Sequence, residues 1–256
     1  MIGRALWFLF IGVCVVFLLS PLVILIVFAF SADRSIALPI NEFGFKWWIA
    51  LFDSPIFWPS VRNSFIVVAT TGTVSTIIGT MAAFAFARMP GRRASLWMSA
   101  LTLPIMTPPL VLGVALLQFY SNAGVPLGLG TVILAHILFT QPFVILIVSA
   151  SMIGFDYATV ASARDLGASP FYAFRKVTLP IVQSSIIGAA LVAMAISLDD
   201  FIVTFFTIGG GNTLPTFLWG MLRKGVSPQL NVVALMLMSV TITISIVAIR
   251  VTRYRG

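Results

Sequence analysis

Long apolar runs recur along the whole chain, and they constrain its fold more than any other feature. Six such runs lie at about residues 5–30, 62–87, 97–120, 131–153, 181–206 and 230–250. Each exceeds the roughly 20 residues that an α-helix needs to cross about 30 Å of hydrocarbon. A backbone in lipid must satisfy its own hydrogen bonds, which a helix does within one segment. The chain is therefore predicted to be an all-α polytopic membrane protein with six transmembrane helices.

Composition agrees with this class. Of the 256 residues, 60% are hydrophobic and 9% are charged, whereas soluble domains are about 25% charged. The formal net charge of +8 is spread over short loops, which indicates membrane topology and argues against nucleic-acid binding. The single cysteine, Cys14, lies in an apolar run and is interpreted as a packing residue, because it cannot form an intrachain disulfide.

Lysines and arginines are unequally divided between the predicted loops. Ten lie on one side, namely Arg4, Arg88, Arg92, Arg93, Arg164, Arg175, Lys176, Arg250, Arg253 and Arg255, and five on the other, namely Arg34, Lys46, Arg62, Arg223 and Lys224. The positive-inside rule places both termini and residues 154–180 in the cytoplasm, with membrane lipid around the spans. The first apolar run exceeds the about 7–15 residues of a signal-peptide core, so it is predicted to be an uncleaved span.

Two loops on the predicted outer side are rich in aromatic residues. Loop 31–61 has Trp and Phe at both ends, which suits the headgroup zone of a membrane. It is interpreted as an interfacial helix that anchors the first hairpin, or alternatively as a docking surface for an outside partner. After a flexible turn at residues 209–211, residues 214–223 are predicted to form another short interfacial helix.

Small residues and prolines mark two of the spans. In the second span Gly79, Ala83 and Ala87 recur every four residues. Such a stripe lets helix backbones approach closely, either within the chain or against a second subunit. In the third span three prolines between residues 104 and 109 predict irregular backbone. This backbone belongs either to a kinked structural helix or to a helix that lines a pathway.

Ionisable side chains within the spans are few. His136 is interpreted as a hydrogen-bonded packing residue rather than a ligand or proton relay, because no second metal-ligating residue lies near it in sequence. Asp199 and Asp200 fall about 27 Å along the fifth helix, in the outer part of the bilayer. A carboxylate at that depth favours a functional reading. Two interpretations remain open: attraction of a cation along a pathway, or contact with Arg62 or other groups at the outer edge.

Motifs of catalysis are missing from the sequence. It contains no G-x-x-x-x-G-K-[ST] phosphate loop, no H-E-x-x-H, no G-x-S-x-G and no pair of cysteines. The chain is therefore predicted to be non-catalytic and to bind no cofactor or metal. If it moves a solute uphill, another chain must supply the energy.

The cytoplasmic segment 154–180, with the sequence GFDYATVASARDLGASPFYAFRKVTLP, is the longest polar break on its side. Its first half has the pattern of an amphipathic helix, which Gly167 ends. Ser169 and Pro170 can start a second short helix, because proline is favoured at the first helical position. Pro180 is predicted to be the joint at which the fifth span begins.

This segment resembles the EAA loop of bacterial ABC-importer permeases, whose pattern is roughly E-A-A-x-x-x-G-A, then a hydrophobic stretch and L-P. The matching residues are Ala163, Gly167, Ala168, Phe174, Val177, Leu179 and Pro180, whereas Ala161 replaces the usual Glu and Ser162 the first Ala. The resemblance implies an ATPase-coupling surface made of Ala161, Ser162, Ala163, Arg164, Asp165, Leu166, Gly167, Ala168, Ser169 and Pro170.

The block from the fifth span onward is similar to the PotC-like permeases of spermidine/putrescine importers. The shared residues are Ser197, Leu198, Asp199, Asp200, Leu214, Pro215, Gly225, Val226, Ser227, Pro228 and Asn231. The resemblance covers nearly the whole chain. It implies a substrate pathway at Asp199, Asp200 and Ser197, where a carboxylate replaces part of the hydration that a cationic polyamine loses.

The resemblance further implies a type I importer with a MetI-like permease fold in the bacterial inner membrane, with residues 1–256 as a single permease domain. Expected partners are a second permease, a periplasmic solute-binding protein and two ATPase subunits that bind ATP and Mg²⁺. Related machines carry other solutes, so an amino-acid derivative or an organophosphonate is the alternative cargo. A secondary transporter or channel is the alternative from another class, although the inverted repeats expected of it are not seen.

Overall fold

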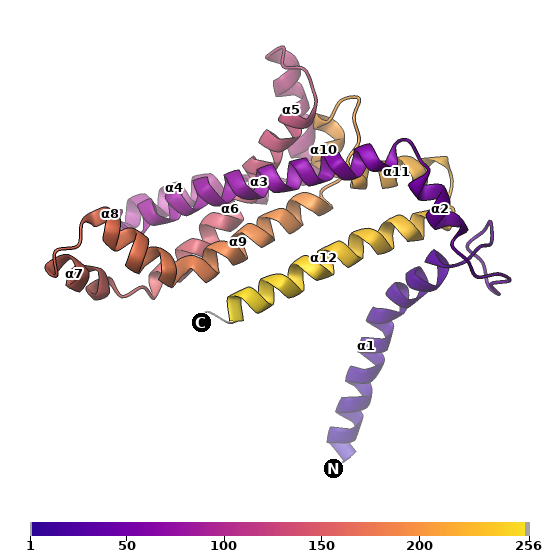
Figure 1. Cartoon of the computed structure of the whole chain (residues 1–256), viewed down its shortest axis with the longest axis horizontal. Coiled ribbons are helices and arrows are strands. Elements are labelled where there is room, and N and C mark those ends of the chain that lie inside the picture. Colours follow the sequence, from indigo (N-terminus) through magenta and orange to yellow (C-terminus); the bar gives the residue numbers. More distant parts are fainter. Residues whose placement is uncertain (1, 254–256) are drawn as a thin grey trace. The chain divides into compact units, whose positions relative to one another are not determined.

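The computed structural model describes residues 2–253, and helices make up most of this part of the chain (Figure 1). The helices are α1 (Ile2–Ala29), α2 (Lys46–Phe52), α3 (Phe57–Phe86), α4 (Gly91–Met106), α5 (Pro109–Asn122), α6 (Leu129–Ile153), α7 (Tyr157–Asp165), α8 (Pro170–Ala173), the π-helical turn η1 (Phe174–Thr178), α9 (Leu179–Asp199), α10 (Ile202–Thr207), α11 (Leu214–Lys224) and α12 (Gln229–Arg253). The helices predicted within loop 31–61 and over 214–223 are observed as α2 and α11.

Five helical stretches are long and apolar enough to cross a membrane by themselves. They are Leu6–Ala29, Phe57–Phe86, Leu129–Ile153, Pro170–Asp199 and Gln229–Val247. The α4–α5 pair makes a sixth if its two helices form one broken span. The prediction of an all-α membrane protein is thereby confirmed, and the number of candidate spans is five, or six if the α4–α5 pair is one span.

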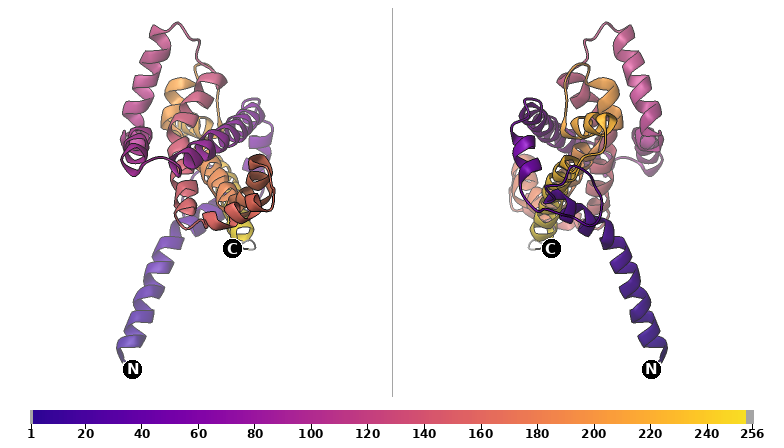
Figure 2. Two further views of the ribbon diagram at one scale, coloured as in Figure 1. Left: turned by 90° about the vertical axis from the view of Figure 1, so that its left-hand side faces the viewer. Right: turned by 90° about the vertical axis from the view of Figure 1, so that its right-hand side faces the viewer.

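The third span contains a sharp break. α4 and α5 are bent by 98° relative to each other, and the two views of Figure 2 show this change of direction. Thr107, between them, is extended with ψ 126°, because a proline at the next position disfavours the helical conformation. Pro109 then occupies the first turn of α5, where its missing N–H costs nothing. The prolines therefore produce the predicted irregular backbone within 97–120 as a turn between two helices.

The fifth span starts and ends earlier than predicted. It runs without interruption from Pro170 through η1 into α9, so Pro180 lies inside a helix and is not a joint. The prediction of one helix over 181–206 is also wrong at its outer end, because α9 stops at Asp199. Asp200 is extended with ψ 120°, and its carboxylate accepts a hydrogen bond from the Thr204 backbone N–H at 2.9 Å. That bond satisfies a donor in the first turn of α10 and so favours a new helix.

The chain divides into two compact units. The first is built from the chain up to Pro59 together with Phe217–Val240, and the second from Ser60–Thr216 together with the chain from Thr241 onward. In the first unit, Trp48 ties α2 to the end of α1. Its Nε1–H donates to the Ala29 carbonyl at 2.9 Å, and its ring stacks on Phe30 with centroids 5.6 Å apart.

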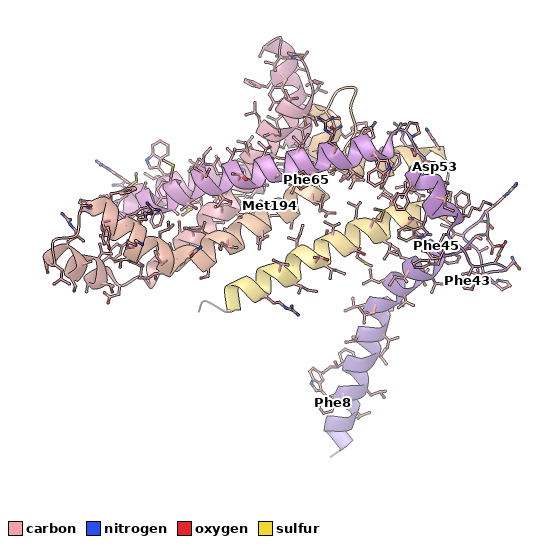
Figure 3. The ribbon with its side chains drawn as sticks, in the orientation of Figure 1. Phe8, Phe43, Phe45, Asp53, Phe65 and Met194 are labelled. Carbon is pink, nitrogen blue, oxygen red and sulfur yellow. The ribbon has the colours of Figure 1, made fainter. Side chains whose placement is uncertain are left out.

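Small residues bring α3, α6 and α9 close together in the second unit. A Cβ at Gly79 would lie 2.7 Å from Cγ1 of Val144 on α6, and a Cβ at Gly72 would collide with Met194, which Figure 3 marks on α9. Ala83 packs in a buried cluster with Val144 and with alanines of α9. The small-residue stripe is therefore a packing surface within the chain.

Gly79→Ala is expected to destabilise the protein, because the added methyl group would overlap the branched Val144 side chain. Overpacking of this kind costs about 1–3 kcal/mol. The measurement is the apparent Tm of the purified protein in detergent. Gly130→Ala is the control, since Gly130 is an exposed α6 position where nothing lies within 4 Å of the added Cβ. Equal Tm values for the two variants would contradict the close approach of α3 and α6.

Candidate functional site

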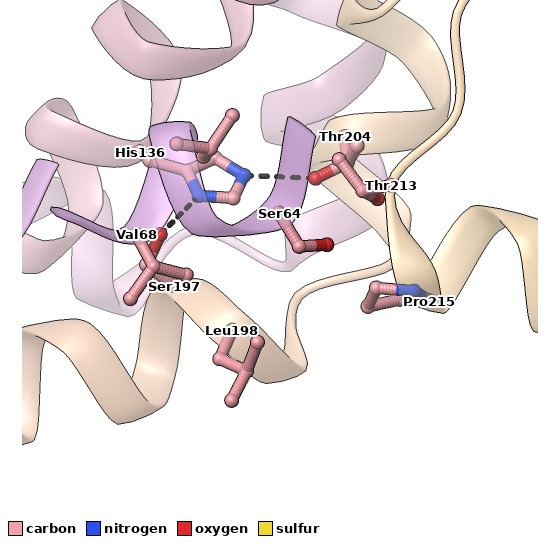
Figure 4. A pocket seen from close by; sticks show the side chains of 9 residues that line it. Ser64, Val68, His136, Ser197, Leu198, Thr204, Thr213 and Pro215 are labelled. Carbon is pink, nitrogen blue, oxygen red and sulfur yellow. Dashed lines mark hydrogen bonds between the residues drawn. The ribbon is translucent and has the colours of Figure 1, made fainter. Parts of the chain in front are cut away.

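A buried polar cluster lies where α9 ends and α10 begins. Its centre is His136, about two turns into α6 and only 1% exposed. Nδ1 of His136 lies 2.7 Å from the Ser197 hydroxyl, and Nε2 lies 2.8 Å from the Thr204 hydroxyl (Figure 4). Nε2 is also 3.3 Å from Oδ2 of Asp200. The prediction that His136 is hydrogen-bonded within the protein is confirmed.

Asp200 is held on several sides. Its carboxylate is 12% exposed and accepts hydrogen bonds from the Thr204 backbone N–H at 2.9 Å and the Thr204 hydroxyl at 3.0 Å. With the His136 contact, these bonds supply the compensation that a carboxylate removed from water needs. Within the described residues Asp200 therefore pairs with His136, and not with Arg62 as the alternative interpretation proposed.

Asp199 has a different environment from its neighbour. It is exposed at the last residue of α9, and in the part of the chain that the structure describes it has no hydrogen bond or ion pair. Ser197, also predicted as a pathway residue, is 3% exposed and bonded to His136. The structure thus places Asp200 and Ser197 together in the cluster and leaves Asp199 outside it.

A small recess adjoins the cluster. It is lined by Ser64, Val67, Val68, His136, Ser197, Leu198, Thr204, Thr213 and Pro215, most of which Figure 4 labels. Its walls leave no room for a water molecule, so the cluster is tightly packed around His136. Among residues 2–253, no three His, Cys, Asp or Glu side chains come together as a metal site would require.

Residues 154–180 have the predicted helix–turn–helix form. Asp156 caps α7 by accepting a hydrogen bond from the Ala158 N–H at 2.8 Å. Gly167 has φ +86°, a conformation that favours glycine, and follows the end of the helix. Ser169 then caps α8 through the Tyr172 N–H at 3.2 Å, with Pro170 in the first turn.

The same segment is anchored to the spans by aromatic and aliphatic contacts. Phe155 is buried in a cluster with Met152 of α6 and Val182 of α9, against which Val160 of α7 packs. Phe84 of α3 packs against the same cluster, and its ring meets that of Phe174 edge to face with centroids 5.4 Å apart. The segment therefore packs directly on α3, α6 and α9.

The predicted coupling residues form an exposed surface. Of Ala161, Ser162, Ala163, Arg164, Asp165, Leu166, Gly167, Ala168, Ser169 and Pro170, all are exposed except Ala163 and Ala168, which are partly buried. Leu166, at the turn between the two helices, is 90% exposed.

Sequence reasoning missed Thr204, which joins His136 to Asp200. The Thr204 hydroxyl, four residues after Asp200, is compatible with a helix start, but no local pattern in the sequence identifies a partner for His136. The reason is distance along the chain, because 61 residues separate His136 from Ser197 and 68 separate it from Thr204. The anchoring contact of Phe84 with Phe174 was missed for the same reason.

A protein family described as the inner membrane component of binding-protein-dependent transport systems matches residues 75–255. This chain belongs to that family. It is therefore a multi-pass membrane permease, in agreement with its apolar helices.

Relatives of the permease extend over almost its whole length. It is 30% identical over 256 residues to the spermidine/putrescine transport system permease protein PotC of Escherichia coli (strain K12), covering 99% of this chain and 96% of the relative. It is 29% identical over 232 residues to the putrescine transport system permease protein PotI of the same strain, covering 87% and 82%. The predicted resemblance to PotC-like permeases is confirmed.

Solved ABC transporter structures share the fold of the permease. A chain of a bacterial alginate ABC transporter, in complex with an alginate pentasaccharide-bound periplasmic protein, has a TM-score of 0.74 at 15% identity, covering 99% of this chain and 94% of that one. A chain of the inward-facing MetNI methionine ABC transporter has a TM-score of 0.64 at 20% identity, covering 80% and 99%. The predicted importer permease fold is confirmed.

Proposed function

We propose that this permease is a subunit of an ATP-driven importer that moves polyamines of the putrescine and spermidine class across the bacterial inner membrane by alternating access. A periplasmic solute-binding protein delivers the solute, and a second permease completes the pathway. Two partner ATPases bind and hydrolyse ATP with Mg²⁺. The permease forms a single transmembrane domain over residues 1–256, binds no cofactor and has both termini in the cytoplasm.

The observation that carries this proposal is the continuous helix Pro170–Asp199. Its 30 residues extend over roughly 45 Å at about 1.5 Å per residue, enough to cross the membrane. The exposed coupling surface precedes one end of this helix, and Asp199 is its other end. A rigid-body displacement at the coupling surface therefore moves Asp199, as switching between two packed states requires.

The cytoplasmic contact is proposed to be made by residues 161–170. Their exposed surface combines the apolar side chain of Leu166 with the charges of Arg164 and Asp165. Docking of this surface in a groove of an ATPase subunit would convert closure of the ATPase pair into movement of α9. Ala161, in place of a glutamate, leaves that position of the contact without a carboxylate.

Polyamines are the proposed cargo because their amines are cationic and Asp199 offers an exposed carboxylate near the outer side. Two of the relatives named above are permease proteins of transport systems for spermidine and putrescine. A carboxylate in a narrow pathway replaces part of the hydration that a cation loses.

The test is transport by the complete assembly. Membranes carrying the permease, its partner permease, the ATPases and the binding protein are reconstituted in vesicles and supplied with labelled putrescine or spermidine. Polyamine accumulation that requires ATP is the expected result. Uptake of an amino-acid derivative or an organophosphonate in place of polyamines would show that the cargo is not a polyamine. Reproducible purification of the permease without any ATPase chain would contradict its proposed role as a subunit of an ATP-driven importer.

A further inference from the structure

The two adjacent aspartates at the end of α9 are in opposite situations. Asp200 is largely buried and has three polar contacts, whereas Asp199 is exposed and has no polar contact within the described residues. Neighbouring residues on a helix point about 100° apart, which allows one to face inward and the other outward. The two carboxylates are chemically identical, but their surroundings in the fold differ.

The cluster around His136 forms a complete chain of donors and acceptors. The Ser197 hydroxyl donates to Nδ1, Nε2–H donates to the Thr204 hydroxyl oxygen, and the Thr204 hydroxyl donates to Oδ2 of Asp200. We assign the Nε2–H tautomer from this network, since it leaves no member unsatisfied.

This chain joins three elements that lie far apart in sequence. His136 belongs to α6, Ser197 to the last turn of α9 and Thr204 to α10. The second carboxylate contact, from the Thr204 backbone N–H, fixes the start of α10 directly after the extended residue Asp200. The place where α9 ends is therefore set by α6, through the imidazole.

We propose that His136 is a positioning residue that holds Asp200 as a structural latch, so that Asp199 alone presents its carboxylate to the transported cation. The latch fixes the α9–α10 junction against α6 and thereby fixes the direction of Asp199. His136 and Asp200 do not touch the solute. The role of Asp199 rests on the proposed function, whereas the latch does not depend on the identity of the cargo.

The test compares Asp199→Asn, Asp200→Asn and His136→Gln in the assembled complex, by apparent Tm and by the KM and maximal rate of putrescine uptake. Asp199→Asn is expected to raise KM at least about fivefold and leave Tm unchanged. Asp200→Asn and His136→Gln are expected to lower Tm by several degrees and to raise KM only together with that loss of Tm, because Asp199 then loses its fixed direction. The double variant His136→Gln/Asp200→Asn is expected to have a Tm no lower than that of the less stable single variant, because both substitutions break the same hydrogen-bond network.

A second pair of variants tests the latch if those at His136 and Asp200 do not assemble. Thr204→Val removes the hydroxyl at nearly constant shape, and Thr204→Ser retains it. The valine variant is expected to lose several degrees of Tm, and the serine variant to stay close to wild type. Equal Tm values for valine and wild type would overturn the latch.

Other outcomes separate the two proposals. If Asp200→Asn raises KM as Asp199→Asn does at unchanged Tm, both carboxylates face the solute and the division of roles is wrong. Additive Tm losses in the double variant would likewise overturn the coupling of His136 to Asp200. If the wild-type assembly takes up no polyamine, the proposed function fails, while the Tm comparisons still decide whether the latch exists.

Discussion

Leu166→Asp is expected to reduce ATP-driven uptake at least about tenfold while the permease still folds. The Leu166 side chain is 90% exposed at the turn between α7 and α8, so it contributes little to the stability of the isolated chain. In the proposed complex it is buried against an ATPase. Removing a central apolar anchor from an interface typically costs 2 kcal/mol or more, and burying an unpaired carboxylate there adds to this loss.

The measurement is uptake by reconstituted vesicles, together with the fraction of ATPase that co-purifies with the permease. Leu38→Asp is the matched control, because Leu38 is a leucine that is 78% exposed in the loop that is predicted to lie on the outer side. The control is expected to keep both co-purification and uptake. If Leu166→Asp retained wild-type uptake and wild-type ATPase binding, residues 161–170 would not be the coupling surface.

Asp199→Lys is the second change with a large expected effect: the apparent KM for putrescine should rise at least about tenfold. At an effective dielectric of about 20, two unit charges a few ångströms apart interact by about 2–4 kcal/mol. Exposure of Asp199 to water and salt weakens this interaction. The substitution nevertheless removes the attraction of Asp199 for a cation and adds the repulsion of a lysine, and both changes weaken cation binding.

Uptake is measured over a range of putrescine concentrations and at two ionic strengths. Asp53→Lys is the control, since it makes the same change of charge at an exposed aspartate of the predicted outer loop. Asp199→Glu, which keeps the charge, is expected to retain most of the uptake. A KM for Asp199→Lys close to that of Asp53→Lys would remove Asp199 from the pathway.

Local patterns in the sequence were sufficient for the features that depend on neighbouring residues. The apolar runs predicted the six candidate spans. The order Gly167, Ser169, Pro170 predicted the turn between α7 and α8, because glycine tolerates positive φ and serine and proline start helices. The prolines near residue 108 predicted irregular backbone, and the structure shows a break bent by 98°.

Features that depend on contacts across the fold were not predictable in this way. The hydropathy of residues 181–206 is that of one span, and only the hydrogen bonds of Asp200 explain why α9 stops at Asp199. The joint expected at Pro180 is absent, because the helix continues without interruption from η1 into α9 through Pro180.

The sequence by itself therefore determined the class of the chain, its candidate spans and the form of its coupling segment. These follow from composition and from residue order over a few turns of helix. Only the tertiary structure decided that Asp199 and Asp200 differ. The physical reason is that burial and partners set the role of a carboxylate, and the partner His136 comes from a helix more than 60 residues away in the chain.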